Sequence, residues 1–281
     1  MSATLRQQAI TQLLCAAVLW SSGGLLIKLV EWNSLAICGT RSAIAALLLI
    51  ALERRIHVRW SVSLWGAALG YAASVLCFVA GTKLTSAGNV IALQYAAPVL
   101  VALFGPWMLG ERTTRADWVM VGTVFVGIFL MFFDQLSFEG RLGDLCGLGA
   151  GLSFSVFVLF MRRQYREEPT QAVILGNIIA LCVALPFMFE GHPSLGGWGV
   201  LVLLGLFQLG LPYALYSRAI RNVSALESSI IPVLEPILNP LWVYIFLGEV
   251  PGLMAAIGCA VILVAVAGKA FLSHDMVGTS G

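Results

Sequence analysis

The sequence is poor in charge. Only 11% of its 281 residues are charged, whereas 59% are hydrophobic and the mean hydropathy is +0.93. A soluble domain is about a quarter charged, so the composition excludes an ordinary soluble domain and indicates a chain that lies in a lipid bilayer. The formal net charge of +2 gives no reason to expect a nucleic-acid partner, and none is predicted.

Several chemical motifs are also missing. The 6 cysteines form no CxxC pair and all lie in apolar stretches, so we predict neither a disulfide nor a metal site. No GxxxxGK[ST] loop is present, which excludes transport driven by nucleotide hydrolysis on this chain. The 3 histidines lie in loops or in the tail, leaving no HExxH site and no deep base for an intramembrane hydrolase. We predict that the protein is not an enzyme and that it binds no cofactor.

Long apolar runs are what the chain has instead. A helix needs about 17 to 25 apolar residues to cross a bilayer, and ten such runs follow one another with short connections. The first run continues past residue 20 without an A-x-A site, so we interpret it as a retained span. The expected spans are Ala9–Val30, Ser34–Leu52, Val62–Gly81, Asn89–Leu109, Ala116–Phe133, Gly143–Met161, Ala172–Phe189, Trp198–Tyr216, Ala225–Leu247 and Leu253–Leu272.

The distribution of basic residues predicts the orientation. If the N-terminus is cytoplasmic, 12 of the 16 Lys and Arg residues lie on the cytoplasmic side. Only Lys28, Lys83 and Arg141 lie outside, and Arg41 lies within a span. Cytoplasmic loops are enriched in Lys and Arg, so we predict a multi-pass protein of the cell inner (cytoplasmic) membrane with both termini cytoplasmic.

The sequence repeats itself after 138 residues. This shift sets the stretch that ends at Glu111 over the stretch that ends at Glu249, and Ser86 meets Ser224 while Pro98 meets Pro236 without a gap. The predicted units are residues 1–136 and 137–274, each with five helices, followed by a flexible tail at 275–281.

An offset of five spans returns the chain to the opposite side of the membrane, so the second unit is expected to be inverted relative to the first. Inverted repeats with interrupted helices at matching positions are typical of secondary transporters, whose site lies at the midplane between the repeats. The predicted fold is therefore all-α and polytopic, with ten transmembrane helices arranged as two inverted five-helix repeats.

These features carry a family resemblance. The five-plus-five spans, the LWSSGG stretch at 19–24, the Pro and terminal Gly-Glu of the fourth span, and the E-P and G-E of the ninth resemble the drug/metabolite transporter superfamily in its EamA-type branch. The likeness is closest to YddG-type aromatic amino acid exporters. It implies a central cavity lined by spans one, three, four, six, eight and nine, with spans five and ten peripheral.

The expected activity is export of aromatic or other apolar amino acids and related small amphipathic metabolites by alternating access. A drug or other metabolite carrier on the same fold stays open, as does an intramembrane lipid-modifying enzyme that uses Glu235. The expected partners are the small-molecule substrate and the lipid bilayer. Whether the functional unit is a monomer is left open.

The ninth span holds the most unusual residues. Glu235, Asn239 and Trp242 lie on one helical face at spacings of three or four, and a polar face inside a bilayer must point to protein or water. Glu235 is an acid near the centre of a span, which marks a functional site by default. A structural carboxyl that satisfies the broken backbone is the alternative.

The other candidates are aromatic and small polar residues expected near mid-depth, which together suit an apolar side chain on a zwitterionic backbone. The predicted substrate-binding set is Trp20, Ser21, Tyr71, Phe78, Gln94, Tyr95, Ser153, Phe154, Phe157, Gln208, Tyr213, Glu235, Asn239 and Trp242. The predicted hinge residues are Pro98, Pro232, Pro236 and Pro240.

Three further expectations concern residues outside these sets. The matched Glu111 and Glu249 are expected to form a helix cap or an ion pair at the edge of a gate. Arg41 is expected to extend toward the membrane interface, with carboxylate binding as the less favoured alternative. The GxxxG steps of the third and sixth spans predict close helix packing.

Overall fold

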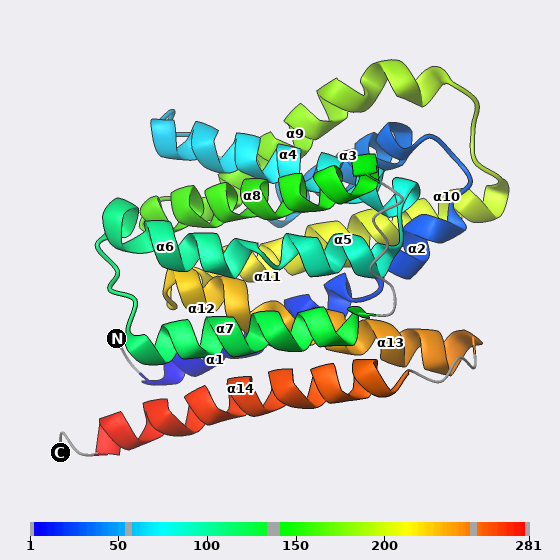
Figure 1. The fold of residues 1–281 in the computed structure, drawn as a ribbon. Coiled ribbons are helices and arrows are strands. Elements are labelled where there is room, and N and C mark those ends of the chain that lie inside the picture. The colour runs from blue at the N-terminus through cyan, green and yellow to red at the C-terminus, as the bar shows by residue number, and fades with distance from the viewer. Residues whose placement is uncertain (1–2, 54–57, 134–140, 248–251, 279–281) are drawn as a thin grey trace.

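The regular elements of the protein are helices throughout the part of the chain that the structure describes (Figure 1). The computed structural model describes residues 3–53, 58–133, 141–247 and 252–278. The prediction of an all-α chain is confirmed.

The helices follow one another as long segments, several of which are divided. The first half contains α1 (Ala3–Trp20), α2 (Gly23–Leu29), α3 (Ser34–Leu52), α4 (Val62–Leu84), α5 (Ala87–Gln94), α6 (Ala97–Leu109) and α7 (Arg115–Met131). The second half contains α8 (Arg141–Arg163), α9 (Pro169–Ala184), a 3-10 segment η2 (Leu185–Phe189), α10 (Leu195–Leu203), a π-helical segment η3 (Leu204–Gly210), α11 (Leu211–Ala219), α12 (Ala225–Ile230), a 3-10 segment η4 (Ile231–Val233), α13 (Leu234–Leu247) and α14 (Leu253–Gly278).

Seven helical stretches among the described residues are long and apolar enough to cross a membrane. They coincide with the first four expected spans and with the sixth, seventh and eighth. The fifth expected span is α7, which has 17 residues. The ninth is α12, η4 and α13 in succession, and the tenth is α14. Large apolar side chains such as Leu69, Val119 and Leu195 are exposed on the outside, as lipid contact requires.

The helices lie roughly parallel in one bundle, and the start of α1 and the end of α14 lie at the same end of it (Figure 1). We call this the terminal end. The main packing partners are α4 with α8, α7 with α14, α3 with α9, α4 with α9, and α1 with α11.

Glycines make the closest of these contacts possible. A Cβ on Gly70 would lie 2.7 Å from the backbone nitrogen of Phe157, and one on Gly151 would lie 2.8 Å from the carbonyl oxygen of Gln94. These contacts join α8 to α4 on one side and to the break between α5 and α6 on the other. The expectation that the GxxxG steps serve close packing is confirmed.

The structural boundaries repeat with the 138-residue shift to within one residue. The helix pairs α5 and α12, α6 and α13, and α7 and α14 begin at residues 87 and 225, 97 and 234, and 115 and 253. Ser86 and Ser224 cap the first pair by accepting hydrogen bonds from the amides of Asn89 and Glu227. The internal breaks fall at Tyr95 and Ala96 in the first half and at 231–233 in the second.

Hydroxyl groups satisfy carbonyls that the prolines leave free. A proline has no amide hydrogen for the carbonyl four residues earlier. Pro106 leaves the Ala102 carbonyl in this position, and the Thr113 hydroxyl donates to that carbonyl at 2.9 Å. Pro236 does the same to the Pro232 carbonyl, which accepts from the Tyr95 hydroxyl at 2.8 Å. The break of the ninth expected span is thus bonded to the break of the fourth.

Candidate functional site

A cavity lies where the two broken segments meet. About 50 Å³ of it is open to the centre of a water molecule, which is room for several waters. Ten predicted residues line this cavity. They are Trp20, Phe78, Gln94, Tyr95, Phe154, Gln208, Tyr213 and Glu235 from the substrate set, and Pro98 and Pro232 from the hinge set. The structure brings these side chains together, and substrate binding by them stays a prediction.

The lining comes from the first, third, fourth, sixth, eighth and ninth expected spans. Among the described residues, α7 and α14 contribute nothing to the cavity and pack against each other. The lining that the family resemblance implied is therefore confirmed, with one addition. The second expected span contributes Arg41 from α3.

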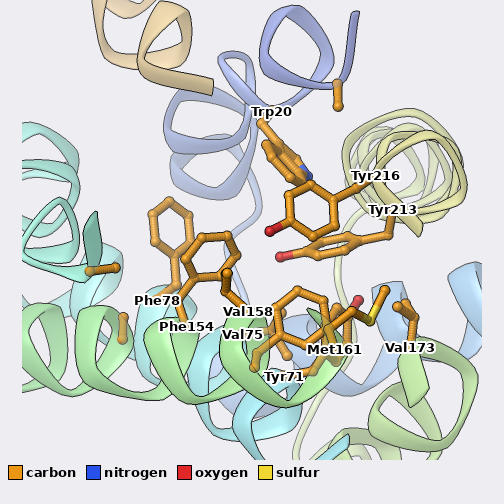
Figure 2. Packing of buried hydrophobic residues seen from close by; sticks show 14 of the residues in the cluster. Trp20, Tyr71, Val75, Phe78, Phe154, Val158, Met161, Val173, Tyr213 and Tyr216 are labelled. Carbon is orange, nitrogen blue, oxygen red and sulfur yellow. The ribbon is translucent and has the colours of Figure 1, made fainter. Parts of the chain in front are cut away.

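Aromatic rings form the apolar wall and the layer behind it. The Trp20 ring lies 4.9 Å from the Tyr213 ring and 5.7 Å from the Tyr216 ring, measured between centroids. Figure 2 shows both tyrosines reaching from one helix toward Trp20 and Phe154 on the others. Such tilted ring pairs contribute packing energy beyond the area that they bury, so this wall is a firm surface against which an apolar group can pack.

Arg41 is one of the most deeply buried side chains of the protein. Its exposed fraction is 1%, and its Nη1 donates to Oε1 of Gln208 at 2.8 Å. The expectation that it extends to the interface is wrong, because the close packing of α3 on η3 holds it inside, where it lines the cavity. Gln208 lies in the π-helical segment, and such segments occur frequently at functional sites.

Glu235 stands at the start of α13 and lines the same cavity. Its carboxyl lies within interaction range of the Tyr95 hydroxyl, which itself donates to the Pro232 carbonyl. The carboxyl is therefore held at the junction of the two breaks, beside a carbonyl that is already satisfied. Both interpretations of Glu235, as a functional group and as a structural one, remain compatible with this position.

Several predicted residues lie outside the cavity lining. Tyr71 is fully buried behind the wall and donates to Oδ1 of Asn177 at 3.1 Å. Ser21 accepts from Nε1 of Trp242 at 2.7 Å, which joins the α1–α2 break to α13. The others outside the lining are Ser153, Phe157 and Pro236. The side chains of Asn239 and Pro240, and Glu249 as a whole, lie outside the described residues.

Six lining residues were not in the predicted set. They are Arg41, Ser74, Val75, Ala97, Leu209 and Ser229. Five of these are small or apolar, and in a chain with this composition such residues carry no signal of their own. Arg41 did carry a signal in the sequence, because a charge inside a span marks a functional site by default.

The terminal end is joined by a network around Glu111. Its Oε1 accepts from Nε of Arg162 at 2.7 Å, and its Oε2 accepts from the amide of Ala225 at 2.8 Å. Arg162 Nη1 also donates to the carbonyl of Ile220, and Arg6 pairs with Glu227 nearby. Glu111 therefore combines an ion pair with a cap on α12, as predicted for it. The network ties α6 of the first half to α8 and α12 of the second.

Replacing Tyr95 with phenylalanine is expected to lower the free energy of unfolding by about 1–3 kcal/mol, the cost of a buried acceptor left unpaired. The substitution removes only the hydroxyl that satisfies the Pro232 carbonyl. Unfolding of the purified protein in detergent by denaturant measures the change. Tyr244→Phe is the matched control, since Tyr244 is on α13 and exposed. Equal stability of the two variants would contradict the role given to this bond.

Known proteins resemble the chain along most of its length. The model of the EamA-like transporter family matches residues 7–133 and again residues 141–269. An uncharacterized transporter of Archaeoglobus fulgidus is 25% identical over 89% of this chain and 92% of its own length. The threonine/homoserine exporter RhtA of Escherichia coli is 25% identical over 74% of this chain and 72% of its own length. The pseudopaline exporter CntI of Pseudomonas aeruginosa is 26% identical over 80% of this chain and 82% of its own length.

A solved crystal structure has the same fold, with a TM-score of 0.81 at 19% identity, covering 95% of this chain and 98% of the other. The narrower likeness to YddG-type exporters stays a prediction. The two matches of the family model together cover far more than half of the sequence, and the apolar helical bundle is the one that a multi-pass membrane carrier requires. The chain therefore belongs to the EamA-like transporter family of the drug/metabolite transporter superfamily.

Proposed function

We propose that this protein is a secondary transporter that exports aromatic or other apolar amino acids and related small amphipathic metabolites. The observation that carries the proposal is the cavity at the junction of the two broken segments. Its wall is aromatic, and its polar groups come from different helices, which suits a solute with an apolar side chain and a polar head. Relatives named as exporters of threonine/homoserine and of pseudopaline support small-metabolite export as the class.

We further propose ten membrane spans in two inverted repeats, residues 1–136 and 137–274. The matching helix boundaries and the two matches of the family model support this division. The packing supports a two-fold relation as well. Exchanging the halves converts the α4–α8 contact into the α11–α1 contact, and the α3–η3 contact into the α9–α4 contact. With five spans per repeat, such an axis must lie in the membrane plane.

Transport would proceed by alternating exposure of the cavity to the two sides of the membrane. The proline-containing breaks of the fourth and ninth spans serve as the hinges, and the Glu111 network closes the terminal end in the state described here. The basic residues assign this end to the cytoplasm. The protein would then reside in the cell inner membrane with both termini inside the cell.

Two other functions would give different experimental results. A drug carrier on the same fold would move bulky hydrophobic cations and not amino acids. A lipid-modifying enzyme would need Glu235 as its acid or base, so Glu235→Gln would abolish lipid turnover in a protein that never moved a solute. The two serines of the described lining, Ser74 and Ser229, donate to the carbonyls of Ala150 and Leu226 and not to a base, which favours transport.

The proposed function is tested with purified protein in proteoliposomes loaded with radiolabelled amino acids. We expect efflux of phenylalanine, tryptophan or leucine down the gradient, and abolished efflux in Val75→Trp, because Val75 lines the cavity. Val119→Trp is the control, since Val119 is 69% exposed on α7, and it should transport normally. Wild-type protein that releases none of the natural amino acids would refute the proposal.

A further inference from the structure

We infer that the cavity recognises an α-amino acid as a zwitterion, with Arg41 binding the carboxylate and Glu235 binding the ammonium group. The inference rests on the proposed transport function and adds the chemistry of recognition to it. The charged residues of the cavity lining are Arg41 from α3 and Glu235 from α13.

Arg41 lacks the anion that a buried guanidinium needs. None of the ion pairs formed within the described part of the chain includes it, and its buried Nε has no hydrogen-bond partner. An uncompensated charge of this kind inside a membrane protein is costly and marks a binding site. Nε1 of Trp20, another lining residue, is also a buried donor without a partner. Both unpaired donors need an acceptor, which a solute carboxylate supplies.

The chain positions Arg41 for this task. Gln208 holds Nη1 through its Oε1, while Gly23 leaves room for the Gln208 amide, since a Cβ there would lie 2.5 Å from Nε2. Gly205 lets α3 approach the π-helical segment, because a Cβ on it would lie 2.5 Å from Cβ of Ile44. The guanidinium is thereby fixed on one side, which prepares it for a planar anion such as a carboxylate.

Glu235 supplies the opposite charge on another wall. A carboxylate is an acceptor, so its natural ligand in the cavity is an ammonium group. Arg41 and Glu235 line the same cavity from different helices, α3 and α13. No ion pair among the described residues joins them directly, so each is left to pair with a solute.

Opposite charges in one cavity also select against other solutes. A simple carboxylic acid would meet Glu235 without an ammonium group to offset it, and a simple amine would meet Arg41 without a carboxylate. A solute that leaves one buried charge unpaired binds more weakly, and this difference gives the cavity its specificity. A zwitterion satisfies both at once, and the ring wall of Trp20, Phe154 and Tyr213 receives its side chain.

The test compares three ligands on each protein. Binding of L-phenylalanine, L-phenylalaninamide and 3-phenylpropionate to the purified full chain is measured by titration in detergent. We expect wild type to prefer the zwitterion. Arg41→Met should weaken phenylalanine about tenfold to a hundredfold, the worth of a charge-assisted bond, and leave the amide unchanged. Glu235→Gln should weaken phenylalanine similarly and leave 3-phenylpropionate unchanged.

The controls separate recognition from damage. Arg141→Met removes an exposed arginine at the start of α8 and should change no affinity. If Arg41→Met weakens the binding of phenylalanine and of its amide equally, or weakens neither, the role of Arg41 is overturned. If Glu235→Gln weakens the binding of phenylalanine and of 3-phenylpropionate equally, or weakens neither, the role of Glu235 is overturned. L-threonine and L-threoninamide form a second pair with another side chain. If the wild type exports amino acids but its variants do not discriminate, only this inference fails. If the wild type moves no amino acid, the proposed function fails.

Discussion

Replacing Gly70 with alanine is expected to destabilise the protein by about 1–3 kcal/mol, the usual cost of overpacking a core, and to abolish export. The new Cβ would lie 2.7 Å from the backbone nitrogen of Phe157 and 2.9 Å from the carbonyl oxygen of Ser153. Backbone atoms inside a helix cannot rotate away, so α4 and α8 must separate. The Ser74 hydroxyl, which bonds the Ala150 carbonyl across this contact at 3.1 Å, would lose its acceptor.

The loss of function follows from where this contact lies. Ser74 and Phe78 on α4 and Phe154 on α8 line the cavity close to the clash, and shifting the helices would displace these side chains. Unfolding in detergent and efflux from proteoliposomes measure the two effects. Gly122→Ala is the matched control, because nothing lies within 4 Å of a Cβ at that position and alanine favours a helix over glycine. Equal behaviour of the two variants would refute the argument.

Much of the fold could be predicted because its boundaries depend on local chemistry. The expected spans Ser34–Leu52 and Ala225–Leu247 have the bounds of α3 and of α12 to α13, since a serine or an asparagine begins each stretch as a cap and the apolar run decides its length. The prolines likewise predicted where the fourth and ninth stretches are broken. What the sequence could not supply was the hydroxyl that bonds the Ala102 or the Pro232 carbonyl, because Thr113 and Tyr95 are brought there by the fold.

The candidate site was predictable only in part, for a physical reason. Thr40, Arg41 and Ser42 follow one another in α3, so they spread around the helix instead of forming a polar stripe, and the sequence does not show which side of the helix faces the protein. Gln208, the partner of Arg41, lies in a π-helical segment, where the usual spacing of three or four residues does not hold. Tyr71 and Phe157 are fully buried, in ring contact with each other and outside the cavity lining, so their contact with a solute stays a prediction.

Replacing Glu111 with glutamine is expected to open the terminal end of the bundle. The carboxylate holds Arg162 and caps α12 through the Ala225 amide, so one group ties the two halves together. Its pair with Arg162 is only 27% and 18% exposed, so solvent screens it less than a surface pair. Losing about 1.5 kcal/mol from such a charged bond shifts the ratio of closed to open states about tenfold.

Cysteine labelling measures this shift. Ser229 lines the cavity and is 3% exposed with the terminal end closed, so Ser229→Cys should react slowly with a membrane-impermeant maleimide. Adding Glu111→Gln should raise the labelling rate about tenfold in inside-out vesicles, the side that the basic residues assign to this end, if the open fraction sets that rate. The parent protein without Ser229→Cys corrects for the 6 native cysteines.

Glu168→Gln provides the matched comparison. Glu168 pairs with Arg221 at 3.0 Å, but the two side chains are 52% and 40% exposed, and exposed pairs contribute about 0–1 kcal/mol. Its removal should leave labelling of Ser229→Cys unchanged. If Glu111→Gln also leaves labelling unchanged, the Glu111 network does not hold the terminal end closed. If labelling rises from the opposite side of the membrane, the assignment of the terminal end to the cytoplasm is wrong, because the cavity then opens outward where the network was broken.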